Sequence, residues 1–121
     1  MAESHDLGKK GEELAAEYLE KAGFSILNRN WKSGKLELDI IAENRDFIVF
    51  VEVKTRSEDF QMHPVTAVNH DKQRSMIYAA EIYIQRNYVD KESRFDIITV
   101  ITKDESYKID HIENAFYPTL R

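Results

Sequence analysis

Apolar residues follow helical spacing in two long segments of the chain. In residues 6–22 and 71–87 they recur every three or four positions, which predicts two amphipathic helices. The inner faces carry Leu7, Leu14, Ala15, Tyr18, Leu19 and Ala22 in the first helix, and Met76, Ala80, Tyr83 and Ile84 in the second. Gly23 stands where a glycine often ends a helix. Glycine weakens a helix, so Gly8 and Gly11 indicate either a later start or a close approach of another backbone.

Runs rich in β-branched and aromatic residues predict the strands of a sheet. They cover residues 24–31, 36–43, 47–55, 94–102 and 106–112. The third run, FIVFVEVKT, is so rich in β-branched residues that we expect burial on both faces and a central position. The last run alternates like an edge strand. Alternation in the second run predicts that one face carries Leu36, Leu38, Ile40 and Ala42.

Turn residues separate the predicted strands, so the order of elements along the chain can be stated. Ser33-Gly34 and Asn44-Arg45-Asp46 are typical of turns, residues 57–63 form a polar loop, and Pro64 is expected to begin a short helical turn. The resulting order is α-β-β-β-α-β-β. It predicts an α/β fold in which a mixed β-sheet of about five strands is flanked by helices. At this length we expect one domain, residues 1–121.

The composition is that of a globular protein without disulfides or membrane-spanning segments. Hydrophobic residues make up 42% of the chain and charged residues 32%, as is typical of a globular protein in water. There is no cysteine, which excludes disulfides, thiol nucleophiles and cysteine-based zinc sites. The N-terminal segment is charged and has no apolar signal core, and the longest purely apolar run, FIVFV, is far too short to span a bilayer. We therefore expect a cytoplasmic protein with no membrane contact.

The net charge of −5 argues against a general polyanion binder. Affinity for nucleic acid depends mainly on Lys and Arg that contact phosphates. A local basic face is still compatible with this charge, and a bound cation would offset acids that serve as metal ligands.

The second and third strands are expected to form a hairpin that concentrates charged side chains. If Arg45-Asp46 is a two-residue loop, Asp39 lies directly opposite Glu52, and Glu37 lies opposite Lys54. Side chains alternate along a strand, so these four would share one face of the sheet. The other face of the third strand would carry Val49, Val51 and Val53.

Two carboxylates that face each other across a strand pair repel and destabilise the sheet. A divalent cation between Asp39 and Glu52 would explain the arrangement, because Mg²⁺ is usually held by one or two carboxylates, with water and phosphate oxygens completing its shell. A lysine on the same face, Lys54, is then placed to stabilise charge on a reacting phosphate or to orient water. The alternative is that these side chains form ordinary ion pairs at the open end of a sheet.

The same residues carry a resemblance to a known family. Asp39 followed by Glu52-Val53-Lys54 resembles the D…(D/E)-x-K core of the restriction-endonuclease-like nucleases. More closely, the chain resembles the bacterial YraN family over nearly its whole length, through the segments GKKGEELAAEYLEKAGFSILNRNW, ELDIIA, VFVEVKTR, the stretch from Pro64 to Arg74, and RFDII. That family is grouped with the PD-(D/E)xK nucleases, near the archaeal Holliday-junction resolvases.

The resemblance implies roles for particular residues. Asp39 and Glu52 would be the metal ligands, with the Val53 carbonyl, and Lys54 would be the catalytic lysine. Glu12 matches the family's glutamate on the N-terminal helix and would either support the metal ligands or bind a second metal ion. The alternative is a solvated acid on the helix surface. The implied cofactor is Mg²⁺, with Mn²⁺ as a substitute. The family often has glycine before its Glu-x-Asp segment, where this chain has Leu36.

Further charged and aromatic residues have two interpretations each. Arg56, Lys72 and Arg74 form either a phosphate-binding rim beside the site or solvated charges. Asp96 interrupts an apolar strand, and a structural role is favoured. Trp31 and Tyr107 are suited to base stacking, although packing in the core or at a sheet edge is the favoured interpretation. The spacing of the four histidines is not that of a zinc site.

The leading hypothesis is therefore a Mg²⁺-dependent endonuclease that hydrolyses phosphodiester bonds in DNA, including branched or structured DNA. The alternatives are a nucleic-acid-binding protein that uses the same acidic site without cleavage, and an interaction scaffold. A resolvase-like role would require a homodimer, because two strands must each meet a site.

Overall fold

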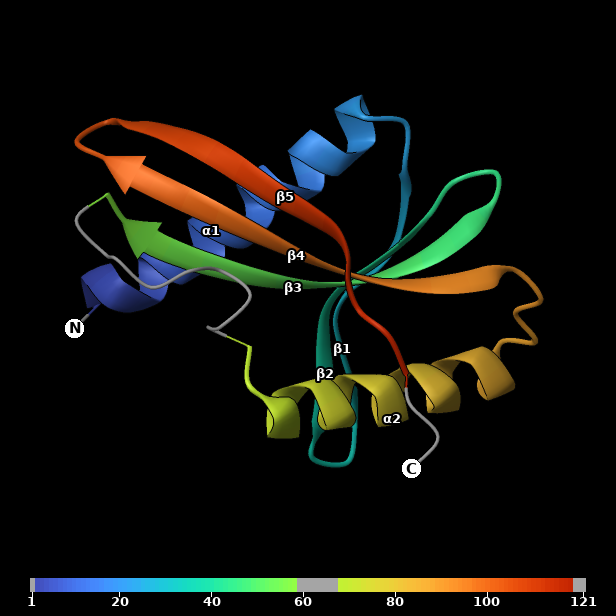
Figure 1. Ribbon diagram of the computed structural model, residues 1–121. Helices are drawn as coiled ribbons and strands as arrows, with labels where there is room; N and C mark the ends of the chain where they lie inside the picture. Colours follow the sequence, from blue (N-terminus) through green and yellow to red (C-terminus); the bar gives the residue numbers. More distant parts are fainter. Residues whose placement is uncertain (1, 59–67, 119–121) are drawn as a thin grey trace.

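The computed structural model describes residues 2–58 and 68–118, and it has the predicted order of elements (Figure 1). The helices are α1 (Ala2–Lys21) and α2 (His70–Arg86). The strands are β1 (Ser25–Ser33), β2 (Leu36–Glu43), β3 (Phe47–Ser57), β4 (Glu92–Lys103) and β5 (Ser106–Phe116). The predicted polar loop and the helical turn at Pro64 fall mostly or wholly outside the described residues.

The five strands form one mixed sheet in the order β1-β2-β3-β4-β5. Only β3 and β4 run parallel, and the connection between them contains α2; the other neighbours are antiparallel. A parallel pair needs such a long crossover, whereas antiparallel neighbours can be joined by short turns. The fold is thus α/β with helices on the sheet, as the sequence predicted. The central place of β3 and the edge position of β5 are also confirmed.

Each face of the sheet packs against one helix. Ala15, Ala16 and Leu19 of α1 lie in one apolar cluster with Val49 and Val51 of β3. The other cluster joins Met76, Ala79, Ala80 and Tyr83 of α2 to Ile48 and Phe50 of the same strand. Residues of β3 therefore alternate between the two clusters, which explains its density of β-branched and aromatic side chains.

Particular residues mark the end of α1 and the start of α2. Gly23 has a φ of +101° directly after α1, a conformation that favours glycine and ends the helix. Asn69 precedes α2, and its side chain accepts a hydrogen bond from the backbone N–H of Lys72. The start of α2 is thereby held in place close to the sheet.

The glycines of α1 lie inside the helix, so the later start considered from the sequence is wrong and a close approach explains one of them. A Cβ at Gly11 would lie 2.0 Å from Oγ1 of Thr55 in β3, whereas a Cβ at Gly8 would meet nothing within 4 Å. Gly11 therefore lets α1 lie directly on β3, one residue before Glu12.

Replacing Gly11 with Ala is expected to destabilise the protein by about 1–3 kcal/mol, because the added methyl group overlaps the Thr55 side chain. Gly8→Ala is the matched control. It should be neutral or stabilising by up to about 1 kcal/mol, since alanine favours the helix and nothing opposes it. Urea unfolding of both variants measures the difference, and Thr55→Ala should restore much of the loss in the Gly11 variant. Equal stability of the two alanine variants would contradict the close approach.

The prediction that one face of β2 carries Leu36, Leu38, Ile40 and Ala42 is wrong. Ile40 and Ala42 pack in the α1 cluster, whereas Leu36 and Leu38 pack in the α2 cluster. Alternation alone would place all four on one side. The change occurs at Asp39, where β2 leaves β3, and Figure 1 shows the β1–β2 hairpin running from this point toward α2.

Candidate active site at the fork between β2 and β3

The sheet divides where the charged residues lie. The β2–β3 ladder runs from Glu43–Ile48 to Ile40–Val51 in the predicted register. The two-residue loop is also confirmed, since Asn44 N–H donates to the Phe47 carbonyl. Beyond Ile40 the strands part: β2 stays paired with β1, and β3 stays paired with β4 (Figure 1). The result is a fork with Asp39 on one branch and Glu52 on the other.

Asp39 bridges the fork. The predicted direct pairing of Asp39 with Glu52 is wrong, because the ladder ends one residue pair earlier. Instead, Oδ2 of Asp39 accepts a hydrogen bond of 2.9 Å from the backbone N–H of Val53. A backbone N–H that has lost its strand partner needs another acceptor, and the carboxylate supplies it. Glu37 is exposed and pairs in register with Lys32 of β1, so its predicted place opposite Lys54 is also wrong.

Glu52 is buried in the fork and faces two lysines. Only 4% of the residue is exposed. Its Oε2 lies 3.2 Å from Nζ of Lys54 in the same strand, and its Oε1 lies 3.6 Å from Nζ of Lys72 in the first turn of α2. The second distance exceeds a hydrogen bond, and Oε1 has no hydrogen-bond partner among the described residues.

The acids of the site interact strongly. Burial raises the pKa of Asp39 from 3.8 to about 7, and the negative charges of Glu52 and Glu12 add to the rise. The hydrogen bond from Val53 and the charge of Lys72 act in the opposite direction. Asp39 thus keeps its proton to a higher pH than an ordinary carboxyl group, as expected for a carboxyl group that shares a site with other carboxylates. Glu12 of α1 is close enough to take part in this coupling.

The fork offers a buried carboxylate oxygen without a hydrogen bond, which suits a divalent ion, but it offers few protein ligands for one. An unpartnered oxygen at a buried carboxylate, such as Oε1 of Glu52, calls for an additional ligand. Within residues 2–58 and 68–118, however, no three His, Cys, Asp or Glu side chains form a ready metal cage. Two carboxylates with open positions match the way Mg²⁺ binds, with water and phosphate oxygens as its other ligands.

Of the predicted basic rim, Lys72 joins the site directly through Glu52. Arg56 lies two residues beyond Lys54 on the same strand, half buried, and donates to the Thr55 carbonyl at 3.0 Å. Arg74 is largely exposed and pairs with Asp71 of its own helix. Of the three residues predicted for the rim, Lys72 and Arg56 therefore lie near the fork, whereas Arg74 lies on another surface.

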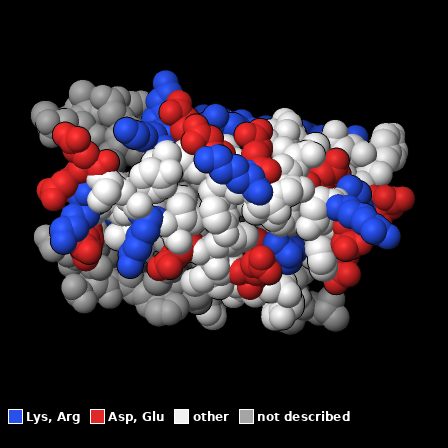
Figure 2. Space-filling view, turned by 90° about the horizontal axis from the view of Figure 1, so that it is seen from above, with Lys and Arg blue, Asp and Glu red and all other residues white. Residues whose placement is uncertain are grey.

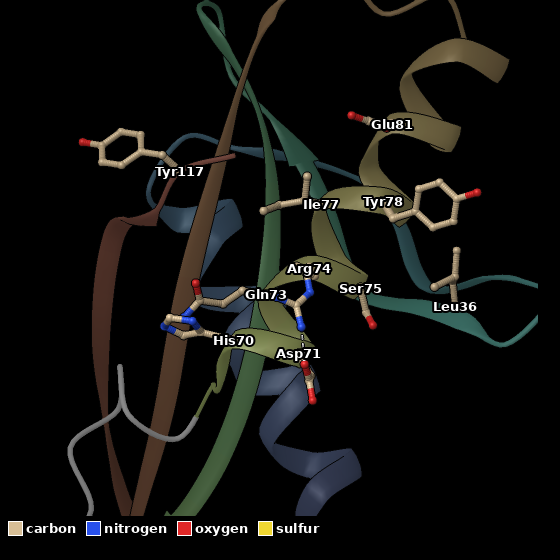
Figure 3. A pocket seen from close by; sticks show the side chains of 10 residues that line it. All are labelled: Leu36, His70, Asp71, Gln73, Arg74, Ser75, Ile77, Tyr78, Glu81 and Tyr117. Carbon is tan, nitrogen blue, oxygen red and sulfur yellow. Dashed lines mark hydrogen bonds and ion pairs between the residues drawn. The ribbon is translucent and has the colours of Figure 1, made fainter. Parts of the chain in front are cut away.

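That other surface is a groove along α2 (Figure 3). Tyr78 and Tyr117 stand at opposite sides of it, and the side chains of Arg74 and Asp71 point toward each other within it. Neither Asp39 nor Glu52 lines the groove. With Asp71 and Glu81 among its lining residues, the groove carries both signs of charge.

The face of the molecule seen in Figure 2 also carries both signs of charge. On the face shown in Figure 2, basic and acidic side chains are interspersed, and neither sign forms a continuous field. With a net charge of −5, the protein does not attract polyanions through its overall field, so contacts with phosphate would depend on the lysines and arginines near the fork.

Asp96 lies on the opposite face of the sheet, in a buried polar network. It accepts two hydrogen bonds from Arg94, one from the Asn114 backbone, and one from Nε2 of His111. Nδ1 of His111 lies 3.0 Å from the hydroxyl group of Tyr18 in α1. Burial alone would raise the pKa of Asp96, but these hydrogen bonds and the charge of Arg94 outweigh it and lower the pKa. The network ties α1 to β4 and β5.

Of the two aromatic residues considered for base stacking, Trp31 pairs in register with Leu38, one residue from Asp39. Trp31 packs edge-on against Tyr83 beside the α2 cluster, and Tyr107 is half exposed near the β4–β5 turn. The contact of Trp31 with Tyr83 agrees with packing against α2, and Tyr107 lies on the edge strand β5.

Two features of the site were missed from the sequence. Lys72 was considered only as a rim residue, although it faces Glu52. Thr99 of β4 lies beside Lys54 in the parallel register, is 3% exposed, and its hydroxyl group has no hydrogen-bond partner among the described residues. The only signal in the sequence for Thr99 was a polar residue within the apolar run IITVI.

The search for membrane-spanning segments is negative: no helix in the described part of the chain is long and apolar enough to cross a bilayer.

Comparison with known proteins identifies the family. Residues 11–100 match the model described as "Uncharacterised protein family UPF0102". A UPF0102 protein of Parabacteroides distasonis is 46% identical over 121 residues, covering 100% of both chains. One of Bacteroides thetaiotaomicron is 47% identical over 120 residues, 99% of both chains, and one of Flavobacterium psychrophilum is 46% identical over 117 residues, 97% of this chain and 98% of its own. The chain therefore belongs to the UPF0102 family, the YraN family that its sequence resembles.

Proposed function

We propose that this protein is a Mg²⁺-dependent endonuclease that hydrolyses phosphodiester bonds in DNA, with branched or otherwise structured DNA as its substrate. One observation carries the proposal: Asp39, Glu52 and Lys54 meet at the fork of the sheet, and a buried oxygen of Glu52 lacks a hydrogen bond. The resemblance of these three residues to the core of the restriction-endonuclease-like nucleases supports the same conclusion.

The roles of the side chains follow from their surroundings. Asp39 and Glu52 would hold the ion through carboxylate oxygens, one from each branch of the fork. When bound, Mg²⁺ would neutralise phosphate charge and lower the pKa of a water molecule. Glu52 holds the ammonium group of Lys54 at 3.2 Å, and this lysine is only 24% exposed. A partly buried positive charge at this place can stabilise the negative charge that develops on the attacked phosphate.

The backbone of β3 contributes rigidity to the site. Glu52 and Lys54 lie on a strand that is paired with β4 along its whole length, from Phe47–Glu92 to Ser57–Thr102. The hydrogen bond from Val53 fixes the carboxylate of Asp39. Catalytic groups on regular elements keep their geometry better than groups on loops.

The test is cleavage of labelled flap, four-way junction, single-stranded and duplex DNA with Mg²⁺ or Mn²⁺. We expect metal-dependent cleavage that is strongest on a structured substrate. Lys54→Met should lower the rate by roughly 100-fold or more. Lys91→Met is the matched control, because Lys91 is a similarly half-buried lysine that pairs with Glu43, away from the fork.

The outcomes separate the alternatives. Binding of DNA without cleavage of any substrate would favour a binding protein, and absence of both would favour an interaction scaffold. If a four-way junction is the substrate, two copies must act together, so sedimentation in the presence of the junction should reveal a homodimer.

A further inference from the structure

Two ammonium groups share the single carboxylate of Glu52. Lys54 comes from the same strand and lies close to Oε2, whereas Lys72 comes from α2 and lies 3.6 Å from Oε1. Lys72 is also near enough to Asp39 for its charge to act on that carboxyl group. The positive charge of Lys72 therefore lies beside the carboxylate of Glu52 and also acts on that of Asp39, the two groups that would hold a metal ion.

The position of Lys72 is set by its own helix. The side-chain oxygen of Asn69 accepts a hydrogen bond from the backbone N–H of Lys72 at 2.9 Å, which fixes the first turn of α2. The neighbouring acid, Asp71, is paired with Arg74 on the exposed side of the helix. The contact between Lys72 and Glu52 thus joins α2 to the fork.

This contact is loose compared with that of Lys54. A charge-assisted hydrogen bond between an ammonium group and a carboxylate is about 2.7–2.9 Å long. At 3.6 Å the ammonium group of Lys72 is too distant for such a bond, and its side chain is 36% exposed. A lysine side chain has a flexible stem, so its ammonium group can move outward without a change in the backbone.

We propose that Lys72 is a displaceable substitute for the metal ion: its ammonium group neutralises the carboxylates of the fork in the metal-free protein and moves to a substrate phosphate when a divalent ion binds. The inference rests on the proposed function, because it assumes that Asp39 and Glu52 bind a cation. It gives Lys72 two successive partners, Glu52 and then a phosphate group.

Removal of this charge should make metal binding tighter. A metal ion bound at Oε1 would lie close to the ammonium group of Lys72, 3.6 Å from the same oxygen. The repulsion between the two positive charges opposes metal binding and favours outward movement of the lysine. Mn²⁺ titration of Lys72→Met, followed by electron paramagnetic resonance or calorimetry, should give a dissociation constant roughly tenfold lower than that of the wild type. Lys72→Arg keeps the charge and should bind Mn²⁺ no more tightly than the wild type.

The control is again Lys91→Met, which removes a half-buried lysine from another Glu pair and should leave the Mn²⁺ affinity unchanged. A second measurement concerns the proposed later partner. In the presence of Ca²⁺, added as a non-catalytic ion, Lys72→Met should bind DNA more weakly, and the slope of affinity against salt should fall by about one phosphate contact.

The results distinguish this inference from the function on which it rests. If the wild type binds Mn²⁺ and Lys72→Met binds it equally or less tightly, Lys72 is not a substitute for the ion, and the nuclease proposal is unaffected. If neither the wild type nor Lys72→Met binds Mn²⁺, the metal site itself is wrong and both proposals fail. Tighter binding by Lys72→Met with unchanged DNA affinity would overturn the second step, the transfer to phosphate.

Discussion

Asp39→Asn is expected to make the metal-free protein more stable at about pH 8 and to abolish stabilisation by Mn²⁺. The amide oxygen of asparagine can still accept the hydrogen bond from Val53, so the fork keeps its geometry. The variant loses only the negative charge that burial and Glu52 make unfavourable. In the wild type, an ion bound as proposed would stabilise the native state by mass action, and the variant would lack one of the two proposed carboxylate ligands.

The free energy of unfolding of the wild type should decrease as pH rises from about 4 to about 7. The pKa of Asp39 is raised from 3.8 to about 7 in the folded protein. Between these values the native state binds a proton that the unfolded chain has released, so wild-type stability decreases as pH rises through this window. The asparagine variant lacks this decrease. Its advantage at about pH 8 should be on the order of 2 kcal/mol, since one pKa unit corresponds to about 1.4 kcal/mol and water screens part of the effect.

Urea unfolding at about pH 5 and pH 8, with and without Mn²⁺, measures these effects. Asp39→Ala is the control, because it removes the charge and also the acceptor for Val53. It should be less stable than the asparagine variant by about 1 kcal/mol. If Asp39→Asn is less stable than the wild type at the higher pH, and Mn²⁺ changes neither protein, the charges at the end of β3 are ordinary ion pairs and the functional proposal is wrong.

Asp96→Asn is expected to destabilise the protein by about 3–5 kcal/mol, because it leaves the guanidinium group of Arg94 buried without its main counter-charge. Arg94 is 8% exposed, and the rings of Phe24 and Phe47, 5.7 and 5.1 Å from its guanidinium carbon, replace little of the lost charge. His111 and the Asn114 backbone lose a charged acceptor as well.

The control is Glu113→Gln, which removes the exposed partner of the same arginine, 3.9 Å away, and should cost less than about 0.5 kcal/mol. The pKa of Asp96 is lowered, so its stabilisation is present above the ordinary carboxyl pKa and is lost as pH falls through the folded value. Urea unfolding at neutral and acid pH should show the difference between wild type and Asp96→Asn narrowing at low pH. Similar losses in the two variants would contradict a network centred on Asp96.

The local signals in the sequence were sufficient for the elements and their order. Helical spacing located α1 and α2, and β-branched density located β3 and its central position, because each pattern records which side chains face the core. The turn at Asn44 also fixed the β2–β3 register, since a two-residue loop leaves only one way to pair the strands. Asp39, Glu52 and Lys54 were found from the same register and from the resemblance to the family.

The tertiary structure decided where that register ends. A hairpin pattern gives no sign that β2 and β3 part after Ile40, because the parting depends on their other neighbours: β2 stays paired with β1, and β3 with β4. For the same reason, Glu37 could not be separated from the site, and the change of face at Leu38 was not visible.

The sequence by itself thus determined the helices, the strands and the acids that lie near one another along a hairpin. Only the tertiary structure decided that Lys72, from a helix distant in the chain, faces Glu52. It also shows the charge of Glu12, which the resemblance had assigned to the site, acting on Asp39. Periodicity describes contacts within an element and between adjacent strands. The approach of α1 depends on Gly11 against Thr55, and that of α2 on the packing of its apolar face, so both are set by contacts between segments far apart in the chain.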